Sequence, residues 1–214
     1  MEIELQYRYS GDKPPLVPTE LGHLPLAGSE SVVMTDSYFD TEQLSLRSAR
    51  CALRVRTVDN RAGAELTWKG PSRRGRRAGK KRTELELPID VFPAEGVELE
   101  ALLRKHGLWK LVRECAGLPD EFRLSSIGRI RTERSRHTYA DGLHVLELSW
   151  DRVQYPVGPD ETRLELEVKS DPAERYLADA DAFLRELFAP DLQPVERGKV
   201  RELCERLYPE LVAA

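Results

Sequence analysis

The sequence has few cysteines and no long apolar run. Its three cysteines, Cys51, Cys115 and Cys204, lie far apart and form no C-x-x-C pair. An odd, scattered set of this kind disfavours a disulfide framework or a zinc site and favours a reducing compartment. No stretch approaches the roughly 18 apolar residues that a membrane-spanning helix needs, and the opening Met-Glu-Ile-Glu does not resemble a signal peptide. We therefore expect a cytoplasmic protein with no membrane partner.

The sequence also lacks an excess of basic charge. Its 33 Lys and Arg residues are outnumbered by 37 Asp and Glu residues, for a net charge of −4, which argues against nucleic acid as a partner. It contains no Walker-type phosphate loop, no G-x-G-x-x-G fingerprint and no G-x-S-x-G nucleophile motif. The four histidines show no metal-ligand spacing, and the three tryptophans are most simply interpreted as packing residues. These absences disfavour P-loop enzymes, dinucleotide-binding enzymes and serine hydrolases.

What the sequence does contain is a set of short segments in which polar and apolar residues alternate. Such alternation is typical of a strand with one dry face, and about eight segments joined mostly by short connections favour an antiparallel sheet in one domain, residues 1–214. The predicted strands cover residues 2–8, 32–40, 51–57, 64–69, 82–87, 127–139, 143–151 and 163–169. Helical spacing predicts an insert at about 94–118 and C-terminal helices at about 172–188 and 197–207. Residues 10–28 are interpreted as a loop with one helical turn, and the basic run 73–82 as a hairpin loop.

The polar faces of these strands carry charges sorted by sign. Each of four strands presents a pair of like charges on one face: Glu2 with Glu4, Arg54 with Arg56, Glu84 with Glu86, and Glu165 with Glu167. Carboxylates from several strands suit a hard divalent cation, whereas Arg and Lys side chains donate to phosphate oxygens. One pair alone is more often a solvated sheet face, but four in a small domain favour a shared site for phosphoryl chemistry. If these faces point inward, the sheet must enclose a charged lumen and helices must cover its apolar outer face.

Seven short motifs follow one another along the chain. They are Glu2-Ile3-Glu4, Tyr38-Phe39-Asp40-Thr41, Ala52-Leu53-Arg54-Val55-Arg56, Leu66-Thr67-Trp68-Lys69-Gly70-Pro71, Arg82-Thr83-Glu84-Leu85-Glu86, Trp150-Asp151-Arg152-Val153 and Leu164-Glu165-Leu166-Glu167. No single motif is specific, but their order and spacing resemble the CYTH superfamily of class IV adenylyl cyclases, thiamine triphosphatases and inorganic triphosphatases. The resemblance covers residues 2 to about 207. It implies an α+β fold in which an eight-stranded antiparallel β-barrel forms a tunnel with a polar lumen, with helices packed on the outside.

The resemblance also implies roles for individual residues. Mg²⁺ or Mn²⁺ would be held by Glu2, Glu4, Asp151, Glu165 and Glu167. Triphosphate oxygens would be held by Arg54, Arg56, Lys69, Arg82, Arg134, Arg136 and Lys199, although Arg129 and Arg131 compete for the place given to Arg134 and Arg136. Lys199 resembles a basic residue on a C-terminal helix that closes over the substrate. Supporting roles fall to Glu84, Glu86 and Glu147.

The opening motif of this sequence departs from the family pattern. That pattern is Glu-x-Glu-x-Lys, and here Gln6 stands at the lysine position, where it cannot supply a positive charge. Arg8 lies on the same predicted strand face and is the nearest basic replacement. The candidate catalytic residues are therefore Gln6, Arg8, Lys69 and Lys199. A second departure is the Pro-rich stretch 10–28, where the family often has a fuller helix.

The leading functional hypothesis is a metal-dependent hydrolase of a triphosphate group, carried by inorganic tripolyphosphate, thiamine triphosphate or a nucleoside triphosphate. One alternative is a class IV adenylyl cyclase, which would make cyclic AMP and pyrophosphate. A further alternative is a non-catalytic module that binds polyanions, since Gln6 removes a charge from the lumen. The expected partner is a small triphosphate molecule, and the sequence leaves a homodimer open.

Overall fold

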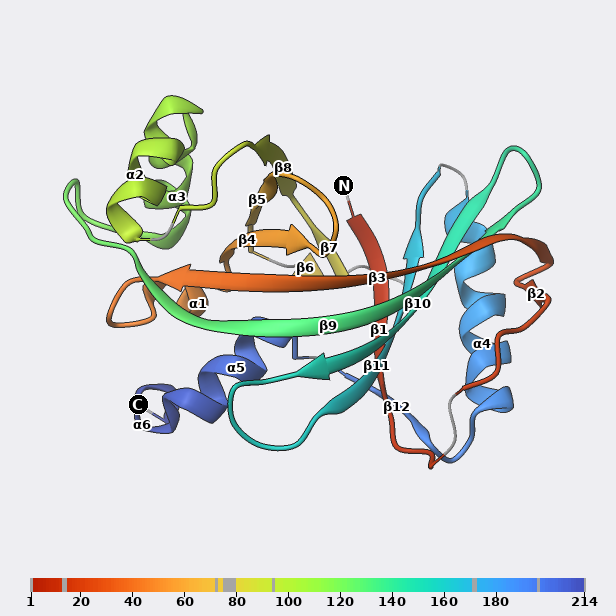
Figure 1. Ribbon diagram of the computed structural model, residues 1–214. Helices are drawn as coiled ribbons and strands as arrows, with labels where there is room; N and C mark the ends of the chain where they lie inside the picture. The colour runs from red at the N-terminus through yellow and green to blue at the C-terminus, as the bar shows by residue number, and fades with distance from the viewer. Residues whose placement is uncertain are drawn as a thin grey trace.

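An antiparallel sheet forms the body of the molecule (Figure 1). The computed structural model describes residues 2–12, 15–71, 73–74, 80–93, 95–170, 173–195 and 197–213. Eight long strands carry the sheet: β1 (Glu2–Tyr9), β3 (Leu24–Asp40), β4 (Ala52–Val58), β5 (Ala64–Lys69), β8 (Glu84–Ile89), β9 (Ser125–Ala140), β10 (Val145–Gln154) and β11 (Glu161–Val168). Four short ones add to it: β2 (Glu20–Leu21), β6 (Arg73–Arg74), β7 (Lys80–Arg82) and β12 (Leu192–Pro194).

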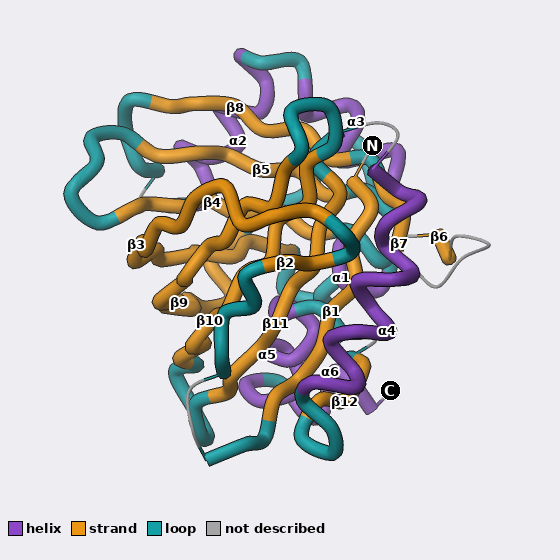
Figure 2. Tube along the Cα trace, turned by 90° about the vertical axis from the view of Figure 1, so that its right-hand side faces the viewer, coloured by secondary structure: helices purple, strands orange, loops and turns teal. Residues whose placement is uncertain are grey.

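The sheet curves round, and among the described residues it is not closed by hydrogen bonds. Its order is β6-β7-β1-β11-β10-β9-β3-β4-β5-β8, and Figure 2 shows it curving from β8 through β3 and β9 to β1, which lies beside the long helix α4. Strands β7 and β8 stand near opposite ends of this order, yet only Thr83 separates them in the chain. The backbone N–H of Gly70 donates to the Thr83 carbonyl at 2.9 Å, which anchors this crossing point. The predicted antiparallel α+β tunnel fold is confirmed, with the chain itself bridging the open seam.

The prediction of a loop over residues 10–28 is wrong for its second half. β2 pairs with the start of β3 across a two-residue turn in which both Gly22 (φ 56°) and His23 (φ 68°) have positive φ angles. Two positive φ angles in succession match the twist of a hairpin. The flanking Leu21 and Leu24 are buried, so local Pro and Gly content concealed a packed hairpin. None of the described residues in this stretch is helical.

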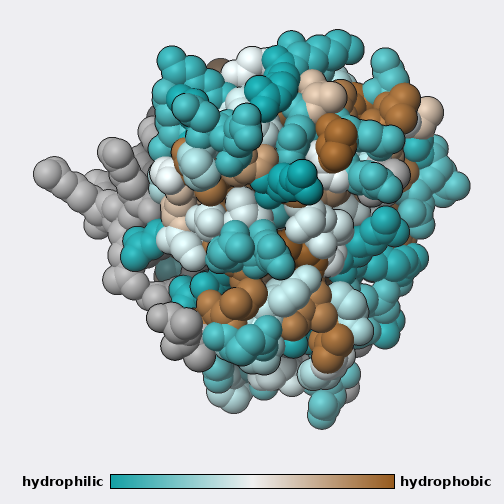
Figure 3. Space-filling model, turned by 90° about the vertical axis from the view of Figure 1, so that its left-hand side faces the viewer, coloured by the Kyte–Doolittle hydropathy of each residue, from teal (hydrophilic) through white to brown (hydrophobic). Residues whose placement is uncertain are grey.

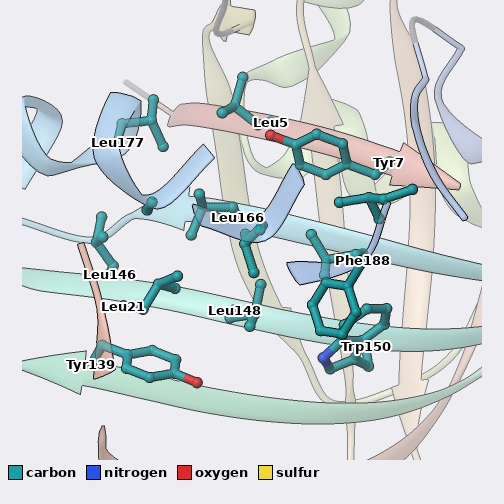
Figure 4. Packing of buried hydrophobic residues seen from close by; sticks show 14 of the residues in the cluster. Leu5, Tyr7, Leu21, Tyr139, Leu146, Leu148, Trp150, Leu166, Leu177 and Phe188 are labelled. Atoms are coloured by element: carbon teal, nitrogen blue, oxygen red, sulfur yellow. The ribbon is translucent and has the colours of Figure 1, made fainter. Parts of the chain in front are cut away.

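Two helical layers cover the apolar outer face of the sheet. α4 (Leu177–Leu187), preceded by the 3₁₀ helix η1 (Ala173–Tyr176), packs on β1, β10 and β11, where Leu5, Leu148 and Leu166 lie in one cluster (Figure 4). α2 (Gly96–Lys105) and α3 (Leu108–Ala116) fall within the predicted insert and cover Leu53 and Leu66 on β4 and β5, together with the short helix α1 (Ser45–Ser48). Figure 3 views the side on which α2 and α3 lie, and most of that face is hydrophilic with separate apolar patches.

The C-terminal helix α5 (Lys199–Leu207), followed by α6 (Pro209–Ala213), packs differently. Its Leu203 and Cys204 cluster with Tyr38, Ile130 and Val153. Strand residues two apart point to the same face of the sheet. Tyr38, Ile130 and Val153 therefore lie on the same face as the charged residues of β3, β9 and β10. α5 therefore covers one end of the lumen rather than the outer face.

A bulge in β9 makes room for α5. The register between β3 and β9 shifts where Tyr38 faces Gly128 and Phe39 faces Ser126, leaving Ile127 as the extra residue. Gly128 has φ 146°, and a Cβ there would lie 2.9 Å from Cδ1 of Leu207. The tyrosine at the end of the helix fixes the same region, since the Tyr208 hydroxyl donates to the Ile127 carbonyl at 3.1 Å. Glycine at this point is required both by the backbone conformation and by the close approach of α5.

Candidate active site

The inner face of the sheet encloses a cavity of about 610 Å³ whose walls are mainly charged. Of the described residues that line it, eight are basic: Arg54, Arg56, Arg61, Lys69, Arg134, Arg136, Lys169 and Lys199. Seven are acidic: Glu4, Glu65, Glu84, Glu86, Glu147, Glu165 and Glu167. Gln6 also lines the cavity. Most of the residues predicted to act on a triphosphate and a metal therefore share one lumen.

Strand register explains why these side chains converge. Glu4 of β1 lies opposite Glu167 of β11, and Gln6 lies opposite Glu165. On the other side of β11, Glu167 also lies opposite Glu147 of β10. Cross-strand partners point to the same face of a sheet, so three neighbouring strands bring their carboxylates to one wall.

The opposite wall is organised around Asp36, a residue that the sequence-based prediction missed. Asp36 is fully buried on β3 and accepts two hydrogen bonds from Arg56, from Nε at 2.6 Å and from Nη2 at 2.8 Å. Arg54 Nη1 lies 3.5 Å from the same carboxylate. Burial alone would raise the pKa of Asp36, but the two guanidinium groups outweigh it and hold that pKa far below its usual value. Asp36 thus stays ionised and orients both arginines.

Arg54 is the more enclosed of these two arginines. Its Nε donates to Oγ1 of Thr67 at 3.2 Å, and its Nη2 lies 3.7 to 3.9 Å from carboxylate oxygens of three strand residues: Glu65, Glu84 and Glu86. Burial alone would lower the pKa of Arg54, but the negative charges of Asp36 and the glutamates outweigh this effect and raise the pKa above its ordinary value. Lys69 on the next strand pairs with Glu84 at 2.7 Å. Glu84 and Glu86 therefore place negative charge beside the cations of this wall.

A second buried cluster joins strands β9, β10 and β11 to helix α5. Arg134 donates to both oxygens of Asp151 at 2.6 Å and also to Glu165. Lys199, the first residue of α5, pairs with Asp151 and lies 2.9 Å from Oε1 of Glu165. Burial would raise the pKa of Glu165, but Lys199 and Arg134 lower it well below its usual value. The cluster ties the helix that covers the lumen to the strands that form it.

The remaining carboxylates of this wall also have cationic neighbours. Lys169 Nζ lies 2.7 Å from Glu167 and 4.0 Å from Glu147, and Nε of Arg136 lies 3.3 Å from Glu147. Each carboxylate described here therefore lies near a cationic side chain from another residue. The pairs of like charges on single strands, such as Glu165 with Glu167, are thus balanced by opposite charges. A lumen of this kind offers donors to anionic oxygens and oxygen ligands to a cation at the same time.

Some candidate residues are placed elsewhere. Arg8 does not line the lumen, because its guanidinium pairs with Glu161 at 2.9 Å and with Glu202 at 3.7 Å. Asp151, which the resemblance placed among the metal ligands, is fully buried behind Arg134 and Lys199, so it contacts those cations and does not line the lumen. The side chains of Glu2 and Arg82 lie outside the described residues.

Only one of the two candidate basic pairs on β9 lines the lumen. Arg134 and Arg136 line it, whereas Arg129 and Arg131 do not. Arg129 lies 5.8 Å from the ring of Phe92, and Arg131 pairs with the exposed Glu133 at 2.7 Å. The geometry therefore favours Arg134 and Arg136 as the pair that faces an anion.

The donor set fits a hard divalent cation in its chemistry. Glu4, Glu147, Glu165 and Glu167 supply carboxylate oxygens to one wall, which are the ligands that Mg²⁺ and Mn²⁺ take. As these side chains stand, no three His, Cys, Asp or Glu residues in the described part of the chain are grouped closely enough to hold a metal ion. Their oxygens are turned instead toward Arg and Lys partners.

In the described part of the chain, no helix is both long and apolar enough to span a membrane.

Comparison with solved structures supports the tunnel fold. The chain is similar over 98% of its length to 98% of a candidate adenylyl cyclase from Hippeastrum that reveals a dominant triphosphatase activity, with a TM-score of 0.68 and 24% identity. A Pyrococcus horikoshii protein matches over 96% of this chain and 99% of that one, with a TM-score of 0.57 and 18% identity. A candidate adenylate cyclase from Bacillus halodurans matches over 80% and 82%, with a TM-score of 0.52 and 20% identity.

Sequence comparison supplies the family. No curated protein sequence matches the chain. A family model for the CYTH domain matches residues 1–198, which include every strand of the sheet and end one residue before α5. With the fold and the charged lumen in agreement, the chain belongs to the CYTH family.

Proposed function

We propose that this protein is a divalent-metal-dependent hydrolase of a triphosphate group. The observation that carries the proposal is the lumen of about 610 Å³, whose walls present both cations and carboxylates to the same enclosed space. Hydrolysis would join the oxygen of water to the terminal phosphorus and break the adjacent P–O bond, releasing orthophosphate and, from tripolyphosphate, pyrophosphate. Such chemistry depends mainly on positioning and on neutralising spread negative charge.

The residues divide this work in a definite way. Arg54 and Arg56, oriented by Asp36, would donate to phosphate oxygens from one wall, and Arg134 with Lys199, oriented by Asp151, from the other. Glu4, Glu165 and Glu167 would hold Mg²⁺ or Mn²⁺. Bound there, the ion would neutralise charge on the phosphate oxygens. Gln6 can donate a hydrogen bond but adds no charge, so positive charge near it would come from Lys69 and Lys199.

The lining of the lumen favours an inorganic triphosphate over a nucleotide. Tyr38 is the only aromatic residue among the described residues that line it, and Tyr38 itself is buried against the α5 cluster. A nucleobase bound in the lumen would therefore find no exposed ring to stack on among these residues. Inorganic tripolyphosphate needs no such surface, and we propose it as the preferred substrate, with thiamine triphosphate and nucleoside triphosphates as slower ones.

One assay separates the alternatives. The protein is incubated with Mg²⁺ or Mn²⁺ and with tripolyphosphate, thiamine triphosphate or ATP, and orthophosphate, pyrophosphate and cyclic AMP are measured. The proposal expects metal-dependent release of orthophosphate. Cyclic AMP with pyrophosphate would support a class IV adenylyl cyclase instead, and tight binding without turnover would support a polyanion-binding module.

Matched variants on one strand test the site itself. Arg136 lines the lumen, whereas Arg131 on the same strand pairs with exposed Glu133. A charge-assisted hydrogen bond contributes about 1.5–3 kcal/mol, so Arg136→Ala should weaken tripolyphosphate binding roughly 10- to 150-fold, while Arg131→Ala should not. Equal effects of the two variants would contradict a lumen site.

A further inference from the structure

The sheet has a second cavity on its other face. It measures about 860 Å³ and is bordered by side chains from β1, β3, β9, β10 and β11. On β9 it is lined by Glu133, Ser135 and His137, which alternate with Arg134 and Arg136 of the lumen, and Val32 and Arg134 border both cavities. Side chains of successive strand residues point to opposite faces, so the sheet separates this outer cavity from the candidate active site.

Two buried polar atoms among the residues of the outer cavity lack partners. Trp150 and His137 are 7% and 6% exposed, and neither Nε1 of Trp150 nor Nε2 of His137 has a hydrogen-bond partner in the described part of the structure. Buried donors and acceptors are nearly always paired, because an unpaired one forfeits its interaction with water. Both residues line the same cavity.

The state of His137 defines what it can offer. Its Nδ1 is 2.8 Å from Oγ of Ser29, which fixes the orientation of the ring. Burial lowers the pKa of His137, so the ring is neutral at pH 7. A neutral imidazole whose Nδ1 is engaged presents at Nε2 either one donor or one acceptor, depending on the tautomer. Trp150 offers a donor only.

The wall beside these atoms is aromatic. Tyr9 and Phe188 contact the ring of Trp150 edge to face, with centroids 5.5 and 5.2 Å away, and Figure 4 shows Trp150 beside Phe188 on the apolar face of the sheet. Ser135 lies directly opposite Trp150 on β9, and its hydroxyl is 3.5 Å from that of Ser31. Of the three rings, Tyr9 and Trp150 line the cavity, which thus combines flat apolar surface with a short row of hydrogen-bonding groups.

We propose that this outer cavity is a binding site for a nucleobase or nucleoside, separate from the triphosphate lumen. A nucleobase is flat and carries ring nitrogens, carbonyl oxygens and amino groups along its edge. The indole N–H of Trp150 donates to one edge acceptor, Nε2 of His137 meets a neighbouring edge group, and the base lies against the aromatic wall. The site is independent of hydrolysis in the lumen and stands whether or not the lumen proves catalytic.

The test is a binding titration with defined probes. Adenosine, guanosine, cytidine and uridine are titrated separately, with D-ribose as the control without a base. Tryptophan fluorescence and calorimetry follow the binding. We expect at least one nucleoside to bind with 1:1 stoichiometry, D-ribose not to bind, and tripolyphosphate not to compete. Trp150→Phe keeps a ring but removes the N–H donor, and should weaken binding about tenfold by calorimetry.

Two further variants make the test specific. Trp109→Phe is the matched control, because Trp109 stacks on Phe122 in the α3 cluster, and it should leave the affinity unchanged. Ser135→Leu fills the cavity from β9 while leaving both Trp150 and His137 in place, and should abolish binding even if Trp150→Phe fails to fold. No binding of any nucleoside would overturn the proposal. So would binding that tripolyphosphate displaces, or binding that Ser135→Leu leaves intact.

Discussion

Replacing Asp36 by Asn tests whether this carboxylate organises the lumen. Asp36 is fully buried, accepts two hydrogen bonds from Arg56 and lies 3.5 Å from Arg54. An amide of the same shape keeps one acceptor but loses the negative charge, so the enclosed guanidinium groups lose their main counter-charge. The structure therefore predicts a less stable protein whose arginines are more available to an added anion.

The size of the effect follows from the burial of the pair. Removing one partner of a buried ion pair costs about 3–5 kcal/mol, which in a chain of this length lowers the unfolding temperature by roughly 6–20 °C. Asp59→Asn is the matched control, because Asp59 is exposed and only approaches Arg131 at 3.9 Å. Surface substitutions of that kind change stability by about 0.5 kcal/mol or less.

Thermal unfolding with and without tripolyphosphate provides the assay. An anion that binds the native state raises its unfolding temperature, and it should do so more in Asp36→Asn than in the wild type, because it replaces the missing counter-charge. If Asp36→Asn unfolds at the same temperature as Asp59→Asn, Asp36 does not hold the two arginines. If tripolyphosphate stabilises the variant less than the wild type, Asp36 serves the anion by orienting the two arginines rather than by competing with it for them.

The pH dependence of the same variant gives an independent check. The pKa of Asp36 is lower in the folded protein than in the unfolded chain, so its contribution to stability is fully present above the unfolded value of about 4 and is lost as the pH falls toward the folded value. The stability difference between wild type and Asp36→Asn should therefore be constant from pH 5 to 7 and shrink below about pH 4. A difference that grows on acidification would contradict this sign.

Two other substitutions test the helix that covers the lumen and the departure from the family motif. Gly128→Ala should destabilise the protein by about 1–3 kcal/mol in chemical unfolding, because φ is 146° and the new Cβ would lie 2.9 Å from Leu207, whereas Gly28→Ala, with open space around it, should not. Equal stabilities would show that α5 does not pack on this bulge. Gln6 lines the lumen opposite Glu165, so Gln6→Lys would add a positive charge there and should raise the turnover of tripolyphosphate by about tenfold. This gain is smaller than the rate effect of a well-placed hydrogen-bond donor in an active site. An unchanged rate of phosphate release would show that the position is not a depleted catalytic one.

The sorting of residues between the two faces of the sheet could be predicted because alternation is local. In β11, Leu164 and Leu166 are fully buried in the outer cluster while Glu165 and Glu167 line the lumen, as their period-two spacing indicates. Strand ends were harder to predict, because the hairpin between β2 and β3 depends on two positive φ angles at Gly22 and His23 within a Pro-rich stretch.

The partners of the charged residues could not be predicted from spacing. Asp36 is one of three carboxylate residues in β3 and has no like charge two positions away, and nothing local indicates that it faces Arg54 and Arg56, which lie 18 and 20 residues further on. The position of Asp151 behind Arg134 likewise depends on the register of β9 and β10 and on the place where α5 returns. The alternation along β3 did carry a usable signal. Asp36 is two residues from Tyr38, so both side chains could be predicted to point to the face opposite that of Phe39.

The pairing of Glu165 leads to a prediction that can be tested without metal. Its carboxylate holds Arg134 and Lys199, two cations that line the lumen and that a triphosphate would also need. A divalent cation bound to Glu165 would free Arg134 and Lys199 for the triphosphate, and a triphosphate bound to these two cations would free Glu165 for the metal. Each ligand should therefore raise the affinity for the other, and by the same factor. In the absence of metal, Glu165→Gln removes the competitor for these cations and should tighten tripolyphosphate binding about fivefold or more, within the usual range of coupling energies. Glu161→Gln, on the same strand but paired with Arg8 and Arg206 outside the lumen, is the control and should leave the affinity unchanged. Calorimetry in chelator measures both. Weaker binding by Glu165→Gln would mean that Glu165 orients the cations for the anion rather than competing with it, and the predicted coupling between metal and triphosphate would then be lost.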